Sequence, residues 1–213
     1  KNTRMLAGRP LVGWSVTHAK AVSRIYKVIV STDSQEIADA AVQAGAERPF
    51  VRPASLAEDT SPEWLVWQHA LKFMREHEGS HPDALVVVPC TAPLRAPVDI
   101  ERCLDEFEKG GADVVIAVTE AHRNPWFNMV KDCGNSRVEL VNRPEGRIVR
   151  RQDVPTVYDI TTVAYVASPE FVLRSGGMFD GVVRCVQVPR ERSLDIDTLF
   201  DFRIAECLKE RLE

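Results

Sequence analysis

The stretch that decides the fold is KVIVSTDSQEIADAAVQAG, residues 27–45. The apolar, β-branched run at 27–30 predicts a short buried strand that ends at Ser31-Thr32-Asp33. Ser34 is a typical N-cap residue, and the helix that it begins is expected to stop at Gly45. A strand followed directly by a helix is the unit from which parallel α/β sheets are built.

The same alternation continues on both sides of this unit. Further strands are expected at 84–88, 113–118, 162–166 and 184–188. Helices are expected at 10–24, 60–77 (begun by a capping box at Thr60 to Glu63), 97–109 and from Asp197 or Thr198 onward, the last with Phe200, Ile204, Leu208 and Leu212 on its apolar face. The pattern predicts a three-layer α/β fold with a mostly parallel sheet, whose ligands bind at the carboxyl ends of the strands.

Residues 122–160 break this rhythm. They are polar and rich in Arg and Asn, and they predict an arm inserted into a single domain that spans 1–213. The densest positive charge of the chain, RIVRRQD at 147–153, lies in this arm, either to capture an anionic substrate or as a solvated loop. Because the sequence begins at Lys1 without an initiator Met and soon enters a helix, we expect residues to precede it.

Composition limits the classes of function. The 213 residues carry 27 Lys and Arg against 31 Asp and Glu, a net charge of −4, so nothing draws the whole chain to nucleic acid or anionic lipid. No apolar run approaches the ~18 residues of a membrane span. The five cysteines contain no CxxC pair, which argues against a disulfide framework or a zinc site and favours a reducing cytoplasm.

Asp195-Ile196-Asp197 precedes the last helix. Two carboxylates two residues apart on an extended segment repel each other unless a cation lies near, and oxygen ligands of this kind suit Mg²⁺ bound together with substrate phosphates. The alternative is purely structural: Asp197 caps the last helix and Asp195 interacts with its dipole. A DxD pattern also occurs as the metal motif of glycosyltransferases.

Two further stretches contain candidate binding residues. PCTAPLR, residues 89–95, follows a predicted strand; Thr91 offers a hydroxyl and Arg95 a fork for phosphate or carboxylate, unless Arg95 merely pairs with a surface carboxylate. Arg52, in FVRP, is expected to contact a base or a phosphate, with a surface arginine at a turn as the alternative.

Taken together, these pieces resemble the CMP-sialic acid synthetases, or acylneuraminate cytidylyltransferases, a family of CMP-nonulosonic acid synthetases. The similarity covers nearly the whole chain in order, through KN at 1–2, LAGRPL at 6–11, VSTD at 30–33, RPASLAEDT at 52–60, TAPLR at 91–95, RQDVP at 151–155 and PRERSLDIDT at 189–198. The last block is the most specific.

The resemblance implies a Rossmann-like nucleotidyltransferase fold, CTP and a free sugar acid as substrates, and a homodimer in which the arm reaches over the neighbour's site. Asp195 and Asp197 would hold Mg²⁺ and act in catalysis with Lys1. The nucleotide would be bound by Lys1, Asn2, Arg52 and Thr91. The sugar acid would be bound by Arg95, Arg151, Gln152, Tyr165 and Phe179.

The departures from the family pattern are Pro89, Phe127 and residues 158–162 on the sugar side, and Glu63 near the base. They indicate an altered acceptor, such as a legionaminic or deaminated acid. The sequence thus predicts a Mg²⁺-dependent cytidylyltransferase that releases pyrophosphate. The alternatives are a DxD-dependent glycosyltransferase, although that motif usually follows an early strand, and a non-catalytic nucleotide-binding module.

Overall fold

The computed structural model describes residues 1–58, 60–143, 146 and 150–212. Its α-helices are α1 (Leu11–Lys20), α2 (Gln35–Gln43), α3 (Glu63–Glu78), α4 (Pro97–Glu108), α5 (Pro169–Arg174) and α6 (Leu199–Leu212). Its strands are β1 (Met5–Leu6), β2 (Arg9–Pro10), β3 (Leu85–Val87), β4 (Val114–Glu120), β5 (Val130–Asp132), β6 (Val138–Leu140), β7 (Tyr158–Ala167) and β8 (Val183–Gln187). Short 3-10 turns are η1 (Ala54–Leu56), η2 (Arg151–Asp153), η3 (Met178–Asp180) and η4 (Arg190–Arg192).

The central sheet has the strand order β3-β7-β4-β8. β4 and β8 are parallel, and both β3 and β4 pair antiparallel with β7. Three of the four strands therefore run in one direction, as predicted, but β7 runs against them. The reason lies in the connection, because β4 and β7 are joined by the arm and not by a crossover helix, so the chain returns as a wide hairpin.

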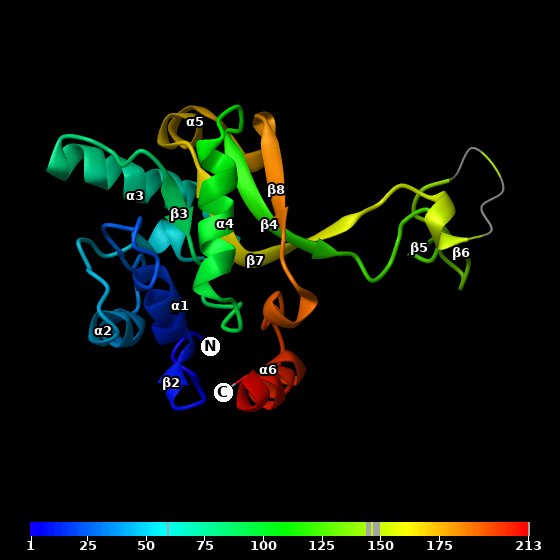
Figure 1. Cartoon of the computed structure of the whole chain (residues 1–213), viewed down its shortest axis with the longest axis horizontal. Helices are drawn as coiled ribbons and strands as arrows, with labels where there is room; N and C mark the ends of the chain where they lie inside the picture. The colour runs from blue at the N-terminus through cyan, green and yellow to red at the C-terminus, as the bar shows by residue number, and fades with distance from the viewer. Residues whose placement is uncertain (59, 144–145, 147–149, 213) are drawn as a thin grey trace.

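Helices cover both faces of this sheet, which confirms the three-layer architecture (Figure 1). Side chains alternate along β4: Val115 and Ala117 pack into the cluster that contains Ile100 and Leu104 of α4. Their neighbours on β4 point to the opposite face, where α3 and α5 supply Trp64, Trp67, Leu71, Phe171 and Val172. None of the helices in the described part of the chain has the length and hydropathy that a membrane span requires.

The helix that follows the predicted first strand forms as the sequence indicated. Ser34 Oγ accepts a hydrogen bond from the Ile37 amide at 3.4 Å, and α2 ends before Gly45, whose φ of +101° favours glycine. The expected strand at 27–30 is reduced to one parallel bridge between Ile29 and Glu47. That prediction was wrong in extent because, among the described residues, this segment has a ladder partner on one side only.

Two local predictions at helix ends and faces are also wrong. α3 begins after Pro62, which has no side chain to cap it, so the predicted capping box is absent. On α6, among residues 199–209, Phe202 and Ala205 are buried, whereas Phe200, assigned to the apolar face, is 70% exposed. The buried face is set by contact with Leu6, Leu11 and Ile196, which the helical pattern alone does not reveal.

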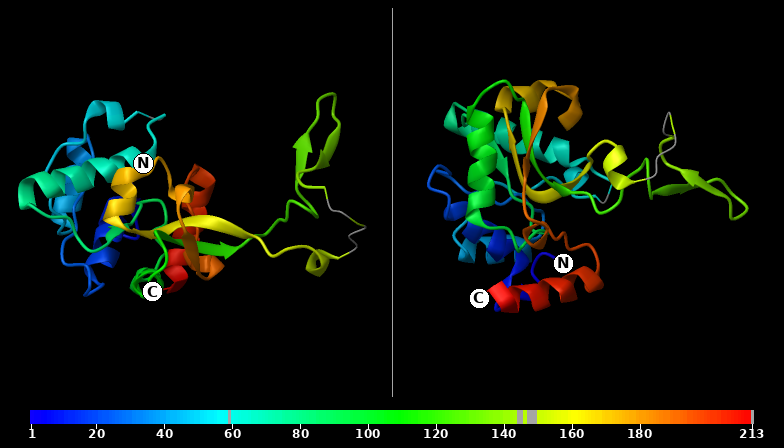
Figure 2. Two further views of the ribbon diagram at one scale, coloured as in Figure 1. Left: turned by 90° about the horizontal axis from the view of Figure 1, so that it is seen from above. Right: turned by 45° about the vertical axis from the view of Figure 1, so that its right-hand side comes forward.

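The arm leaves the body where β4 and β7 extend beyond the rest of the sheet. Thr119 pairs with Asp159 and Glu120 with Tyr158, so the base of the arm is a two-stranded ribbon. Its outer part contains the β5–β6 hairpin, and the views agree that it projects away from the body (Figures 1 and 2).

Candidate active site

The two carboxylates of the DxD segment lie beyond the carboxyl end of β8. Ile196, between them, is buried against Leu6 and Leu11, and its amide donates to the Thr91 carbonyl at 2.8 Å. Because side chains alternate along an extended segment, burial of Ile196 turns Asp195 and Asp197 together toward the other side. The segment therefore presents a pair of carboxylates.

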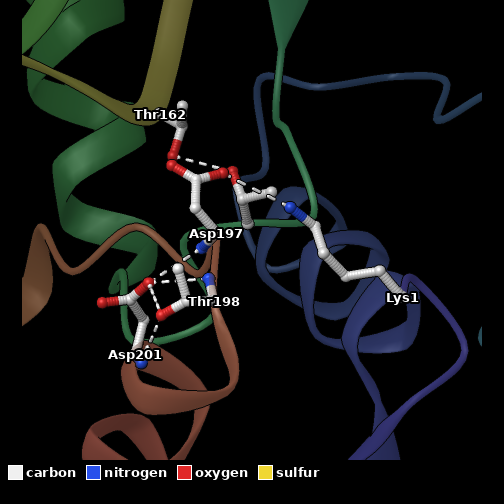
Figure 3. Close-up of polar contacts among 6 residues, drawn as sticks. Lys1, Thr162, Asp197, Thr198 and Asp201 are labelled. Carbon is white, nitrogen blue, oxygen red and sulfur yellow. Dashed lines mark hydrogen bonds and ion pairs between the residues drawn. The ribbon is translucent and has the colours of Figure 1, made fainter. Parts of the chain in front are cut away.

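The start of α6 decides between the metal and the capping interpretations of this pair (Figure 3). Thr198 and Asp201 cap the helix reciprocally: Asp201 Oδ2 accepts from the Thr198 amide at 2.7 Å, and Thr198 Oγ1 accepts from the Asp201 amide at 3.2 Å. The Asp197 amide also donates to Asp201, at 3.2 Å. The carboxylate of Asp197 is consequently not the helix cap.

Lys1 and Asp197 come together from opposite ends of the chain. Lys1 Nζ lies 3.5 Å from Asp197 Oδ1, and the two side chains are 43% and 75% exposed (Figure 3). An ion pair this exposed contributes little to stability, so its significance is the convergence of a cation and an anion at one place.

The donor set fits Mg²⁺. Asp195 Oδ1 is buried and has no hydrogen-bond partner among the described residues, and Asp197 is open to solvent. The described residues contain no cluster of three or more His, Cys, Asp or Glu that would make a protein-only cage. A magnesium ion held by one or two carboxylates, water and phosphate oxygens matches this arrangement, whereas a closed zinc or calcium site does not.

A cavity of about 710 Å³ is lined in part by Thr91, whose carbonyl accepts the hydrogen bond from the Ile196 amide; Asp195 and Asp197 themselves are not among the residues that line it. Asn2, Arg52 and Thr91, three of the residues predicted to bind a nucleotide, line it together with Ser31 and Glu63. Its volume is within the range of small-molecule sites. The structure thus brings together residues predicted from three separate stretches, while their roles stay predictions.

Arg52 is held in a fixed position on this cavity. Its Nε donates to Ser31 Oγ at 3.2 Å, and Nη2 contacts the Ser31 carbonyl. Burial lowers the pKa of Arg52, and nearby acidic groups, Asp33 and Glu63, oppose that shift. The guanidinium is therefore pre-oriented rather than free at the surface, which excludes the interpretation of Arg52 as a plain surface arginine.

The Thr91–Arg95 loop contributes a hydroxyl at its start and a buried anchor at its end. Thr91 Oγ1 donates to Thr162 Oγ1 at 2.9 Å. Arg95 is only 2% exposed and donates to Ser15 Oγ at 2.8 Å, to the Thr162 carbonyl at 3.0 Å and to the Pro89 carbonyl. Because both terminal nitrogens are used internally, Arg95 holds the loop in place, and the expected contact with a sugar acid is not what this geometry offers.

Two other predicted sugar-acid residues lie in different parts of the fold. Tyr165 is buried in the core, with its ring 5.5 Å from that of Trp67, and burial raises its pKa to about 12. Besides burial, the charges of Glu63 and Asp195 raise the pKa of Tyr165, so Tyr165 lies within electrostatic reach of Asp195. Phe179 is 68% exposed and precedes β8, at the end of the sheet opposite to Asp195 and Asp197. Strand direction explains the position of Phe179, because residues before and after a strand lie at opposite ends of it.

The basic stretch of the arm is described only in part. Residues 147–149 lie outside the described residues. Arg150 pairs with Asp153 at 3.2 Å, and Arg151 and Gln152 belong to η2, which is part of the projecting arm. The structure therefore does not bring Arg151 and Gln152 to the cavity of their own chain.

Sequence reasoning missed the side-chain contacts at the two ends of the DxD segment. Asp201 and Thr198 fix the end of the DxD segment, and Asp99 and Arg192 form a buried ion pair at its start. The spacing of Thr198 and Asp201, an N-cap residue followed three positions later by an acid, was the available signal for the first pair. No spacing in the sequence indicates the second.

The chain matches the family model described as "Cytidylyltransferase" over residues 1–167. It is 30% identical over 208 residues to the CMP-N,N'-diacetyllegionaminic acid synthase of Campylobacter jejuni, covering 98% of this chain and 87% of the relative. It is 29% identical over 212 residues to the enzyme of the same name from Legionella pneumophila, covering 99% and 89%.

A solved structure, that of CMP:2-keto-3-deoxy-manno-octonic acid synthetase complexed with CTP, has a TM-score of 0.70. The aligned region covers 100% of this chain and 92% of the chain in that structure. At 14% sequence identity, the similarity shows a shared fold. The family match and the sequence relatives go further: the chain belongs to the cytidylyltransferase family of nucleotidyltransferases, in the group of the CMP-nonulosonic acid synthetases.

Proposed function

We propose that the protein transfers CMP from CTP to the anomeric hydroxyl of a nine-carbon keto-deoxy sugar acid and releases pyrophosphate in a Mg²⁺-dependent reaction. The observation that carries this proposal is the ion pair between Lys1 and Asp197, whose carboxylate, like that of Asp195, does not cap α6. Arg52 lines the cavity next to this segment. Positive charge, paired carboxylates and a pre-oriented guanidinium are the groups that a nucleoside triphosphate requires.

In the proposed reaction the sugar hydroxyl oxygen forms a bond to the α-phosphorus of CTP. The bond from that phosphorus to the bridging oxygen breaks, and pyrophosphate leaves with both bonding electrons while the hydroxyl proton passes to water. No protein nucleophile is needed, so the residues act by alignment and by charge. Magnesium, when bound by Asp195 and Asp197, would offset charge on the phosphoryl oxygens.

The roles of the remaining residues follow from their positions. Lys1 would interact with the phosphates, since its ammonium lies next to Asp197. Arg52 and Asn2, on the wall of the cavity, would orient the nucleoside. Thr91 would place its hydroxyl at the same end, where Thr162 fixes its direction.

The acceptor side is proposed to be completed by a second subunit. Arg151 and Gln152, proposed to bind the carboxylate of the sugar acid, lie on an arm that projects from its own body. The arm exposes apolar side chains, among them Val130 and Val138, which a partner surface would cover. A homodimer with the arm over the neighbour's cavity accounts for both features.

The nature of the acceptor follows from the relatives' names and from the departures in this chain. Two relatives are named for N,N'-diacetyllegionaminic acid. Pro89, Phe127 and residues 158–162 differ from the pattern of sialic acid enzymes, so we favour a legionaminic or deaminated acid. A cytoplasmic location is part of the same proposal, supported by five free cysteines.

The test measures pyrophosphate release from CTP and Mg²⁺ with a panel of free sialic, legionaminic, pseudaminic and deaminated acids. We expect release with at least one acid, loss of release when Mg²⁺ is chelated, and much slower release with UTP or ATP. A glycosyltransferase would instead consume a nucleotide sugar and leave CTP intact. Absence of pyrophosphate with every acid would contradict the proposal.

A further inference from the structure

The segment that bears the two carboxylates has little regular structure of its own. Between the end of β8 and the start of α6, only the short turn η4 is regular. A segment of this kind needs external attachments to keep two side chains in one orientation. Two of its attachments connect it to the stretch that runs from Thr91 into α4.

The first attachment is a bidentate ion pair between Arg192 and Asp99. Arg192 Nε donates to Asp99 Oδ2 and Nη2 donates to Oδ1, both at 2.9 Å. Asp99 is 0% exposed, and its Oδ2 also accepts from the Ala96 amide at 2.9 Å, at the start of α4. The carboxylate is thus fixed by three hydrogen bonds and favoured by the positive end of the helix dipole.

The second attachment is the hydrogen bond from the Ile196 amide to the Thr91 carbonyl. It lies three residues before α6 begins at Leu199. Asp195 lies between Arg192 and Ile196, and Asp197 directly follows Ile196. The two cross-links therefore bracket Asp195 and border Asp197. If the Arg192 side chain lost its ion pair with Asp99, the backbone between Arg192 and Ile196 could rotate, and the Asp195 oxygens would then turn away from the side of Asp197.

We propose that Asp99 and Arg192 form a positioning pair that sets the direction in which Asp195 and Asp197 present their oxygens, and so sets the affinity of the site for Mg²⁺. Neither residue touches the substrate. The inference rests on the proposed function, because it assumes that the two carboxylates hold a divalent cation. The pair needs the planar fork of arginine, since lysine offers a single ammonium and cannot make two parallel hydrogen bonds.

The experiment compares Arg192→Gln, Asp99→Asn and the double variant with the wild type. The Mg²⁺ concentration that gives half-maximal pyrophosphate release is measured at saturating CTP and sugar acid. We expect each single variant to raise it about tenfold, the usual scale for residues that orient metal ligands. Excess Mg²⁺ should restore most of kcat. The double variant should need no more Mg²⁺ for half-maximal release than the more strongly affected single variant, because both changes remove the same ion pair.

Arg190→Gln is the matched control. It removes the same charge from the same turn, but Arg190 is exposed, and the one hydrogen bond described for its side chain goes to the His122 ring. It should leave the Mg²⁺ requirement unchanged. Urea unfolding selects the variants that are folded, and Arg192→Lys, which keeps a charge beside Asp99, serves if Arg192→Gln does not fold. We expect an intermediate rise for the lysine variant.

A second measurement separates this inference from the proposed function. Binding of Mn²⁺, an oxygen-preferring substitute for Mg²⁺, is followed by electron paramagnetic resonance with and without CTP, where no turnover is needed. Weaker Mn²⁺ binding in the Asp99 and Arg192 variants supports the positioning pair even if no sugar acid reacts. The positioning pair would be overturned if folded variants kept the wild-type dependence on Mg²⁺ and the wild-type affinity for Mn²⁺. It would also be overturned if the losses of metal affinity in the two single variants added in the double variant.

Discussion

The body and the arm of this protein hold their charged groups in opposite ways. In the body, Arg95 and Asp99 are buried and bonded to several partners each. In the arm, Glu139 pairs with Arg143 and Lys131, and Arg150 with Asp153, all on exposed or half-exposed surface. The charged groups proposed to bind the nucleotide and the metal are thus held within one chain, whereas those of the arm lie on its exposed surface.

This difference explains why the candidate site is only partly assembled in one subunit. Asn2, Arg52 and Thr91 line one cavity, and Lys1 pairs with Asp197. The bond from the Ile196 amide to the Thr91 carbonyl connects the two groups. Arg151 and Gln152 lie apart from both groups, because the arm leads them away from their own sheet. The comparison yields four predictions, ordered by the size of the expected effect.

Asp197→Ala should lower kcat by about a hundredfold or more, since loss of one preorganised electrostatic partner costs that much. The rate of pyrophosphate release at saturating CTP, sugar acid and Mg²⁺ measures it. Glu206→Ala is the control, because it removes an exposed carboxylate of α6 outside the DxD segment and should leave kcat unchanged. Near-wild-type turnover of the alanine variant would remove Asp197 from the metal site.

Arg151→Ala should raise KM for the sugar acid about tenfold and leave KM for CTP unchanged, because one charged contact with a carboxylate is worth about that factor. Steady-state kinetics with each substrate varied in turn measure the split. Arg143→Ala is the matched arm control, as it removes an exposed pair with Glu139 and should change neither constant. A rise in KM for CTP instead would assign Arg151 to the nucleotide.

His18 should make the body sensitive to acid. Burial, together with Arg95, lowers its pKa from 6.5 to about 4, so the folded protein favours the neutral ring. Its contribution to stability is complete above pH 6.5 and is lost as the pH falls toward 4, by up to about 3 kcal/mol. Urea unfolding between pH 7 and 4.5 should show a shallower decline for His18→Gln than for the wild type.

The control for that measurement is His77→Gln, a change at an exposed residue of α3. It should keep the wild-type dependence on pH. An equally steep decline in His18→Gln would show that other groups cause the loss of stability in acid.

Thr198→Ala should have the smallest effect. Removing this N-cap should lower the free energy of unfolding by about 1 kcal/mol while kcat changes less than about twofold. Thermal unfolding and turnover of the same sample measure both. A large fall in kcat with intact stability would mean that Thr198, and not the carboxylate pair alone, contacts the substrate.

Much of the fold could be predicted because the determining signals are local. Ser34 and Gly45 bound α2, and the helical spacing of Trp64, Trp67 and Leu71 predicts their burial. The reversed direction of β7 could not be predicted, since it depends on how a long arm returns. The buried face of α6 is set by distant residues such as Leu6, so helical periodicity alone assigned Phe200 to the wrong side.

The candidate site divides in the same way. The DxD segment and Arg52 were candidates from short stretches of sequence, and Lys1 from the family resemblance; the structure pairs Lys1 with Asp197 and places Arg52 on the cavity. The position of Phe179 could not be predicted, because it depends on which end of the sheet the residue occupies. The role of Tyr165, which lies within electrostatic reach of Asp195, stays a prediction. The pairing of Asp99 with Arg192 joins residues that are 93 positions apart, and no local pattern records it.

The central claim is that one subunit supplies the carboxylates and its partner supplies the arm to the same site. Subunits with Asp197→Ala and subunits with Arg151→Ala are each assayed alone and then mixed under conditions that exchange subunits. The sugar-acid concentration is kept well below KM, where the predicted tenfold rise in KM leaves Arg151→Ala alone with about a tenth of the wild-type rate. Half of the randomly formed dimers would be mixed, and one of their two sites would be free of both changes, so the mixture should regain about a quarter of wild-type pyrophosphate release. No recovery, although subunit exchange is demonstrated, would contradict the account.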